Sequence, residues 1–265
     1  MADNILHTIA EHAKVRVSEA KKKIPEELLK EQALSLCEKQ PLSGFPFEAA
    51  LAKEGMSFIC ECKKASPSKG IIAEEFPYLE IAKDYEKAGA SCISVLTEPK
   101  WFLGSDSYLQ EIAAAVSIPC IRKDFVVDEY MIYQARLLGA SAVLLICSLL
   151  DEQTISHYIN LCDRLGLSAL VEAHDETEIG DAVRAGARII GVNNRNLKDF
   201  TVDIHNSERL RALVPGHILF VAESGIRTAE DIATLERANV NGVLIGETLM
   251  RSPDKKKMLD ELRGK

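Results

Sequence analysis

Charged side chains interrupt four short apolar stretches of the chain, each near the end of its stretch. Burying a charge is costly unless a partner or a function retains it. Ammonium and carboxylate groups that converge in one pocket can act as general acids and bases. We therefore interpret five residues as candidate catalytic groups. They are Glu61, Lys63, Lys123, Glu172 and Glu223.

The spacing of the first two charges indicates where they point. Successive side chains of a β-strand alternate between its two faces, so Glu61 and Lys63 share one face while Cys60 and Cys62 take the other. An ion pair at the strand end is the structural alternative for any one of these charges. Five such groups at the same end of four strands favour a common pocket instead.

These charges must be positioned by a repeating pattern of elements. After residue 50, short apolar runs alternate with amphipathic stretches eight times. Parallel strands need crossover helices that cover the sheet, so eight such units predict an α/β fold, a closed (β/α)₈ TIM barrel. The runs are SFICEC, CISVL, PCIRK, AVLLIC, SALVEA, IIGVNN, ILFVAES and GVLIG.

A weak internal repeat supports the barrel. The segments AGASCISV, LGASAVLL and AGARIIGV lead into every second strand, and the five charges occupy the other strands. Because each layer inside such a barrel takes its side chains from alternate strands, these charges are expected to converge at the carboxyl ends, where barrel enzymes place their chemistry. We predict one domain over residues 1–265, in which residues 1–50 form a helical extension over the barrel.

The last two units predict a phosphate site. AESGI follows the seventh strand and LIGETL the eighth, so backbone N–H groups of Ser224, Gly225 and Gly246 lie where barrels commonly hold a phosphate. A helix is expected to begin at Glu247. A glycine after a strand often serves only to form a turn, but two such loops together favour the phosphate site.

Two further segments can complete the pocket. Ser66 begins the turn SPSKG after the first strand, which could form another wall. Asn193 and Arg195 share one parity at the end of the sixth strand, where they could bind an anionic or amine-bearing ligand. A solvated loop is the alternative for both residues.

Composition limits the class of protein. The 265 residues are 47% hydrophobic and carry a net charge of −8, which argues against a nucleic-acid surface. The longest apolar run is too short for a membrane helix and the N-terminus lacks a secretory signal, so we expect a cytoplasmic protein. The seven cysteines and six histidines match no metal-ligand spacing. We expect reduced cysteines, and neither metal, membrane nor nucleic acid as partner.

The motifs together resemble one enzyme family. ECKKASPSKG, TEPKWFLGS, IRKDFVVDEY, ALVEAH, IGVNNRNL, AESGI and GVLIGETLM occur in the order typical of indole-3-glycerol phosphate synthase. The resemblance covers nearly the whole chain, including an N-terminal helical segment. It implies closure of the indole ring in tryptophan biosynthesis: 1-(o-carboxyphenylamino)-1-deoxyribulose 5-phosphate loses carbon dioxide and water to give indole-3-glycerol phosphate. No cofactor or metal is implied, only a phosphorylated small-molecule substrate.

By this resemblance, each candidate residue acquires an expected role. Lys123 would protonate the ketone oxygen, and Lys63 would bind the substrate carboxylate and assist dehydration. Glu172 would be the base or stabilise a cation, while Glu61 and Glu223 would position the lysines. Phe125 would pack on the aromatic ring of the substrate, and Asn193 would orient its anilino group. The residues expected around the phosphate are Ser224, Gly225, Gly246 and Glu247.

Two alternatives remain at this point. One is another phosphate-binding barrel enzyme, such as phosphoribosylanthranilate isomerase, whose family uses a cysteine and an aspartate. Cys60 and Cys62 have the wrong parity for that role. The other is a barrel that binds a phosphorylated metabolite without turnover, against which the complete set of acids and bases argues. We expect a monomer, and association with other enzymes of the pathway is open.

Overall fold

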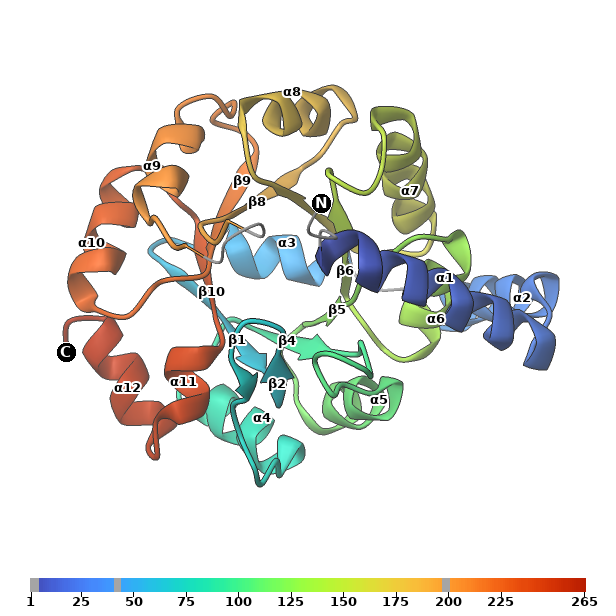
Figure 1. The fold of residues 1–265 in the computed structure, drawn as a ribbon, viewed down its shortest axis with the longest axis horizontal. Helices are drawn as coiled ribbons and strands as arrows, with labels where there is room; N and C mark the ends of the chain where they lie inside the picture. The colour runs from blue at the N-terminus through green and yellow to red at the C-terminus, as the bar shows by residue number, and fades with distance from the viewer. Residues whose placement is uncertain (1–4, 41–43, 197–200) are drawn as a thin grey trace.

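Eight parallel strands form a closed barrel in the computed structural model, which describes residues 5–40, 44–196 and 201–265. Each strand pairs with its neighbours along the chain, and the first closes on the last (Figure 1). The predicted (β/α)₈ fold is confirmed. The strands are β1 (Ser57–Cys62), β4 (Cys92–Leu96), β5 (Cys120–Lys123), β6 (Ala142–Ile146), β7 (Ser168–Ala173), β8 (Ile189–Asn193), β9 (Leu219–Glu223) and β10 (Gly242–Ile245).

Helices surround the barrel and extend it at both termini. A short antiparallel ladder of β2 (Ala65–Ser66) and β3 (Gly70–Ile71) forms the turn after β1. The helices of the described residues are α1 (Ile5–Lys23), α2 (Glu26–Lys39), α3 (Pro46–Leu51), α4 (Tyr78–Lys87), α5 (Asp106–Ala115), α6 (Glu129–Leu137), α7 (Glu152–Arg164), α8 (Glu176–Arg184), α9 (His205–Arg211), α10 (Ala229–Arg237), α11 (Glu247–Arg251) and α12 (Lys255–Leu262). Within these ranges, no helix is long and apolar enough to cross a membrane.

The alternation of side chains along the strands divides the apolar core into two layers. On β1, Phe58, Cys60 and Cys62 belong to the layer between strands and helices. Ile59 belongs to the layer inside the barrel, together with residues such as Leu170 on β7. Glu61 has the inward parity of Ile59, so the fold directs its carboxylate into the barrel mouth.

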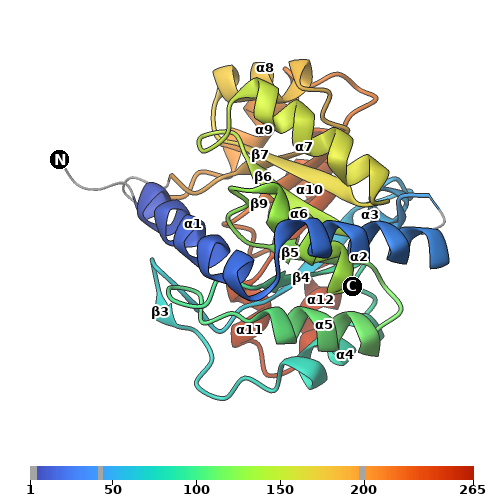
Figure 2. The ribbon, with the colours of Figure 1, turned by 90° about the vertical axis from the view of Figure 1, so that its right-hand side faces the viewer.

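Helices of the N-terminal segment lie at opposite ends of the barrel. Figure 2 shows α1 on one side of the strands and α3 on the other. Phe47 and Leu51 of α3 pack inside the barrel with Ile59, and Ser57 Oγ donates to the carbonyl of Ala50, so α3 fills the end where the strands begin. The helix α2 packs outside, along α6. Among the described residues of the extension, the helix α1 lies over the carboxyl ends, where Ile5, Leu6 and Ile9 line the pocket.

Candidate active site

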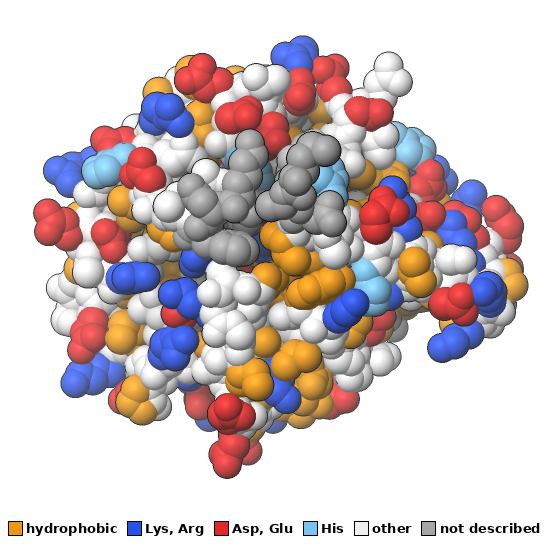
Figure 3. All heavy atoms as spheres, viewed as in Figure 1, with side chains coloured by type: hydrophobic (Ala, Val, Ile, Leu, Met, Phe, Trp, Pro, Cys, Tyr) orange, Lys and Arg blue, Asp and Glu red, His pale blue; other side chains and the backbone are white. Residues whose placement is uncertain are grey.

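A pocket of about 500 Å³ opens at the carboxyl ends of the strands, under the first turns of α1. On this face of the molecule, Lys and Arg side chains gather on one side of the centre and hydrophobic side chains on the other (Figure 3). The structure brings every candidate residue of the sequence analysis to this pocket. Its lining includes Glu61, Lys63, Ser66, Lys123, Phe125, Glu172, Asn193, Arg195, Glu223, Ser224, Gly225, Gly246 and Glu247.

Lys123 lies between two buried carboxylates. Its Nζ is 3.2 Å from Oε2 of Glu172, near the end of β7, and 3.2 Å from Oε2 of Glu223, the last residue of β9. Burial disfavours the ammonium ion, but the carboxylates of Glu223, Glu172 and Glu61 outweigh burial and raise the pKa of Lys123. The lysine is therefore protonated at neutral pH. The strand order explains why these three side chains are close, because β5, β7 and β9 are alternate strands of the barrel and contribute side chains to the same layer.

The two carboxylates beside Lys123 differ in acid strength. Burial and the negative charge of Glu172 together raise the pKa of Glu223 to about 7. The charge of Lys123 lowers this pKa but offsets only part of the two effects. Burial also disfavours ionised Glu172, but Lys123 and His174 lower its pKa below the ordinary value. Asn193 Nδ2 donates to Glu172 at 3.4 Å, whereas Oε1 of Glu223 has no hydrogen-bond partner among the described residues. Near pH 7 Glu172 is therefore ionised, whereas Glu223 can hold a proton.

A second ion pair lies beside this group. Lys63 Nζ donates to Oε2 of Glu61, and Ser94 Oγ lies 3.4 Å from the other oxygen. A Cβ atom at Gly246 would lie 2.7 Å from Lys63 Nζ, so any larger residue at this position in the loop after β10 would displace this ion pair. The shared direction of Glu61 and Lys63 agrees with their predicted parity.

Backbone N–H groups gather at the ends of β9 and β10. Ser224 and Gly225 both have positive φ, +68° and +85°, which is uncommon for serine and turns the loop sharply. The helix α11 begins at Glu247, directly after Gly246, so its first N–H groups have no partner within the helix. Two arginines that the sequence analysis did not single out, Arg227 and Arg251, also line the pocket. Amide donors and cations together suit a phosphate.

His174 was also missed by the sequence analysis. It directly follows β7; its Nε2 lies 3.4 Å from Oε1 of Glu172 and its Nδ1 lies 3.1 Å from Glu178. Burial opposes its protonation, but the carboxylates of Glu178 and Glu172 prevail and raise its pKa. No repeated pattern predicts this contact, because it depends on where α8 places Glu178.

One wall of the pocket is apolar. Leu6 and Ile9 of α1 line it, opposite the charged layer. Phe102 and Phe125 stand with their ring centroids 6.1 Å apart on the side of β4 and β5. A substrate with an aromatic ring could bind against this wall while its anionic groups face the lysines and arginines.

The cysteines and histidines form no competing site in the described ranges. Cys60 and Cys62 are buried in the layer between strands and helices, and neither lines the pocket. This placement removes the thiol that a cysteine-based isomerase would need. Among the described residues, no group of three or more His, Cys, Asp or Glu side chains is arranged so that it could hold a metal ion.

Comparison with known proteins identifies close relatives over the whole length. A family model described as indole-3-glycerol phosphate synthase matches residues 6–262. The chain is 58% identical to indole-3-glycerol phosphate synthase of Ruminiclostridium cellulolyticum, over 98% of this chain and 99% of the relative. It is 51% identical to the enzyme of that name in Lachnoclostridium phytofermentans, over 98% of both chains.

Solved structures share the fold at low sequence identity. A 3-hexulose-6-phosphate synthase matches with a TM-score of 0.61 and 16% identity, over 79% of this chain and 99% of the other. A thiamine phosphate pyrophosphorylase from Pyrococcus furiosus matches with a TM-score of 0.59 and 15% identity, over 79% and 94%. At such identities the likeness extends to the fold alone.

Proposed function

The chain belongs to the indole-3-glycerol phosphate synthase family, and from this premise we propose how its pocket performs the reaction. The enzyme is a carboxy-lyase of tryptophan biosynthesis that converts 1-(o-carboxyphenylamino)-1-deoxyribulose 5-phosphate to indole-3-glycerol phosphate. A ring carbon attacks the ketone, carbon dioxide leaves, and water is eliminated. Family membership removes the alternative of a metabolite-binding barrel without turnover.

Lys123 is the proposed general acid of ring closure. As the new carbon–carbon bond forms, the ketone oxygen gains negative charge and takes a proton from Nζ of Lys123. The observation that carries this role is the position of Nζ between the carboxylates of Glu172 and Glu223, which keep the lysine charged before it donates. Glu223, whose pKa is raised to about 7, can return a proton to the lysine through the same contact.

Lys63 and Glu172 are assigned to the later steps. Lys63 is the partner of the substrate carboxylate before carbon dioxide leaves, and it supplies a proton to the departing hydroxyl group. Glu172, which its lowered pKa keeps ionised, accepts the proton that the intermediate loses during dehydration or stabilises the cation that precedes this loss. Glu61 holds Lys63 through their ion pair, and Glu223 does the same for Lys123.

The remaining pocket residues bind the substrate in this proposal. Its phosphate lies against the amides that follow β9 and β10, at Ser224, Gly225, Gly246 and Glu247. Its aromatic ring packs on Phe125, and Asn193 orients the anilino nitrogen. Arg195 and Ser66 complete the walls. The finer expectations of a monomer working in the cytoplasm stay predictions.

Following indole formation by fluorescence with the purified protein tests these roles. Lys123→Ala should lower kcat by about a hundredfold to ten-thousandfold, with a much smaller change in KM, because a positioned acid contributes mainly to the chemical step. Lys64→Ala is the matched control, since Lys64 adjoins Lys63 in the chain but does not line the pocket. A Lys123→Ala enzyme that turns over within about threefold of the parent would remove this lysine from the mechanism.

A further inference from the structure

A salt bridge joins α1 to the residue that follows Lys123. Arg16 Nη2 donates to Oδ1 of Asp124 at 2.6 Å and Nη1 donates to Oδ2 at 3.1 Å, so the guanidinium pairs with both oxygens. The Asp124 side chain is fully buried, and that of Arg16 is 22% exposed. Paired donors of this kind fix geometry as well as charge. The contact spans 108 positions of the chain.

Asp124 is tied directly to the pocket wall. Its Oδ1 accepts the backbone N–H of Phe125 at 2.8 Å, and its Oδ2 accepts the hydroxyl of Thr97 at 2.6 Å. The backbone of Thr97 in turn donates to the carbonyl of Lys123 at 3.2 Å. The carboxylate of Asp124 therefore holds the backbone from Lys123, the proposed acid, to Phe125, which forms part of the aromatic wall.

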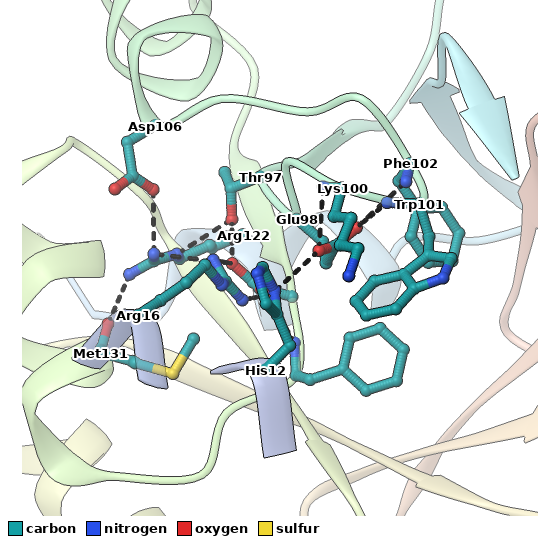
Figure 4. Close-up of polar contacts among 12 residues, drawn as sticks. His12, Arg16, Thr97, Glu98, Lys100, Trp101, Phe102, Asp106, Arg122 and Met131 are labelled. Atoms are coloured by element: carbon teal, nitrogen blue, oxygen red, sulfur yellow. Dashed lines mark hydrogen bonds and ion pairs between the residues drawn. The ribbon is translucent and has the colours of Figure 1, made fainter. Parts of the chain in front are cut away.

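Arg16 is the main counter-ion of this carboxylate. Arg122, the other cation near Asp124, is 3.6 Å away and is occupied by other partners. Its Nη2 donates to Asp106 at 2.9 Å and its Nη1 to the carbonyl of Met131 at 2.9 Å (Figure 4). Burial raises the pKa of Asp124, yet the hydrogen bonds from Arg16 and the charge of Arg122 bring it below the ordinary value. Without Arg16, a buried anion would lack its closest positive partner.

The same helix reaches a second buried carboxylate nearby. Glu98 accepts the N–H groups of Lys100, Trp101 and Phe102 at 2.7 to 3.0 Å, which folds the turn that presents Phe102 to the pocket. Figure 4 shows His12 of α1 directed at Glu98, with His12 Nδ1 3.7 Å from the carboxylate. One face of α1 thus contacts both turns that carry the aromatic wall.

We propose that Arg16 is a positioning residue of the active site, which fixes the Lys123 to Phe125 segment by pairing with Asp124. This inference rests on the proposed role of Lys123. It differs from a simple covering role for α1, because a cover changes substrate binding whereas a displaced acid changes the chemical step. A displacement of about 1 Å can cost on the order of a hundredfold in rate.

Steady-state kinetics and thermal melts of Arg16 variants test the proposal. Arg16→Met, which keeps the apolar stem, should lower kcat at saturating substrate by about tenfold or more. Arg16→Lys should give an intermediate kcat, because an ammonium ion cannot pair with both oxygens. Asp124→Asn should also lower kcat, and the double variant should lose no more than the worse single variant, since both changes remove one contact.

Lys21→Met is the matched control. Lys21 lies on the same helix and bridges to Asp128 and Glu26, both at 2.9 Å, outside the pocket. It should lower the melting temperature while kcat stays within about twofold of the parent. Equal losses of kcat in both variants would show that Arg16 only docks the helix, and a rise of KM without loss of kcat would show that α1 is only a cover. Either result overturns the proposal.

Two further measurements separate the possible failures. Lys123→Ala is assayed beside Arg16→Met: a loss in the first without a loss in the second overturns this inference alone, whereas retained activity in Lys123→Ala overturns the proposed function. The only tryptophan, Trp101, packs edge-on against His12 at 5.3 Å between ring centroids. Its emission therefore shows, without substrate, whether each folded variant keeps α1 in place; an Arg16→Met enzyme with parental emission and lowered kcat supports the proposal.

Discussion

Glu172 and Glu223 lie near the carboxyl ends of two strands that contribute to the same barrel layer, yet their surroundings give the two carboxylates different acid strengths. Glu172 has Asn193 and His174 as additional partners, while one oxygen of Glu223 lacks a hydrogen-bond partner among the described residues. Two titratable groups whose environments push their pKa values apart are a common basis for acid and base roles. Both carboxylates contact the same ammonium group, that of Lys123.

The raised pKa of Glu223 predicts a pH dependence of stability. Burial raises this pKa from 4.5 to about 7, so the folded protein retains a proton that the unfolded chain releases. The contribution of Glu223 is complete below about pH 4.5 and is lost as the pH rises through about 7. We therefore compare the melting temperature of the parent with that of Glu223→Gln at each pH. The difference, parent minus variant, should fall by several degrees as the pH rises across that window and then level off.

A surface variant controls for the change of charge. Glu230 is exposed on α10, so the melting temperature of Glu230→Gln should differ from that of the parent by about the same amount at every pH. A parent-minus-variant difference for Glu223→Gln that stays constant, or that rises with pH, would contradict the raised pKa.

Residues inside the strands were predictable, and residues that act across the fold were not. The charges of the strands stand out because alternation fixes their direction from local sequence alone. Arg16 and His174 carry no such signal: the first meets Asp124 more than a hundred positions away, and the second depends on a glutamate of the next helix. A surface helix commonly presents arginines to solvent, so its sequence does not reveal the buried partner.

At the scale of elements, the strand pattern was sufficient but the terminal helices were not. The eight apolar runs correspond to the eight barrel strands because each run, apart from the charges near its end, is apolar on both faces, as parallel strands covered by helices require. The six-residue helix α3 is too short to be stable alone, and its place inside the barrel depends on packing of Phe47 and Leu51. The division into one domain with residues 1–50 as its extension stays a prediction.

The first turns of α1 are expected to affect substrate binding rather than chemistry. Ile9 is buried against the pocket, whereas Arg16 lies about two turns further along the helix. Ile9→Ala should therefore raise KM by about threefold to tenfold while kcat changes less than about twofold, because it removes apolar contact and leaves the Arg16 pair intact. Steady-state kinetics over a wide range of substrate concentration measure both constants.

Val17→Ala provides the comparison for this helix. Val17 is buried but does not line the substrate pocket, so its truncation should cost stability without raising KM. If Val17→Ala and Ile9→Ala raised KM equally, looser docking of α1 would explain both results and the direct contact of Ile9 would not.

In the whole molecule, groups for reaction and groups for stability lie at opposite ends of the barrel. The pocket occupies the carboxyl ends, and α3 closes the other end. Arg188, just before β8, joins that closing helix to the outer layer: its Nη2 lies 2.9 Å from Glu48 of α3 and 2.7 Å from Asp163 of α7. In barrels of this kind, interactions at the end where strands begin serve stability.

Arg188→Met should accordingly lower stability and spare catalysis. The side chain is 38% exposed, so solvent weakens each ion pair, but it contacts two carboxylates and the ring of Phe45 at 4.5 Å. Its loss should cost about 1 to 2 kcal/mol, or roughly 2 to 8 °C in melting temperature, with kcat within about twofold of the parent. Arg237→Met is the control, because Arg237 bonds only within α10 in the described structure and should change the melting temperature by less. A fall in kcat for Arg188→Met at a temperature where the variant is fully folded would mean that the two ends of the barrel are coupled.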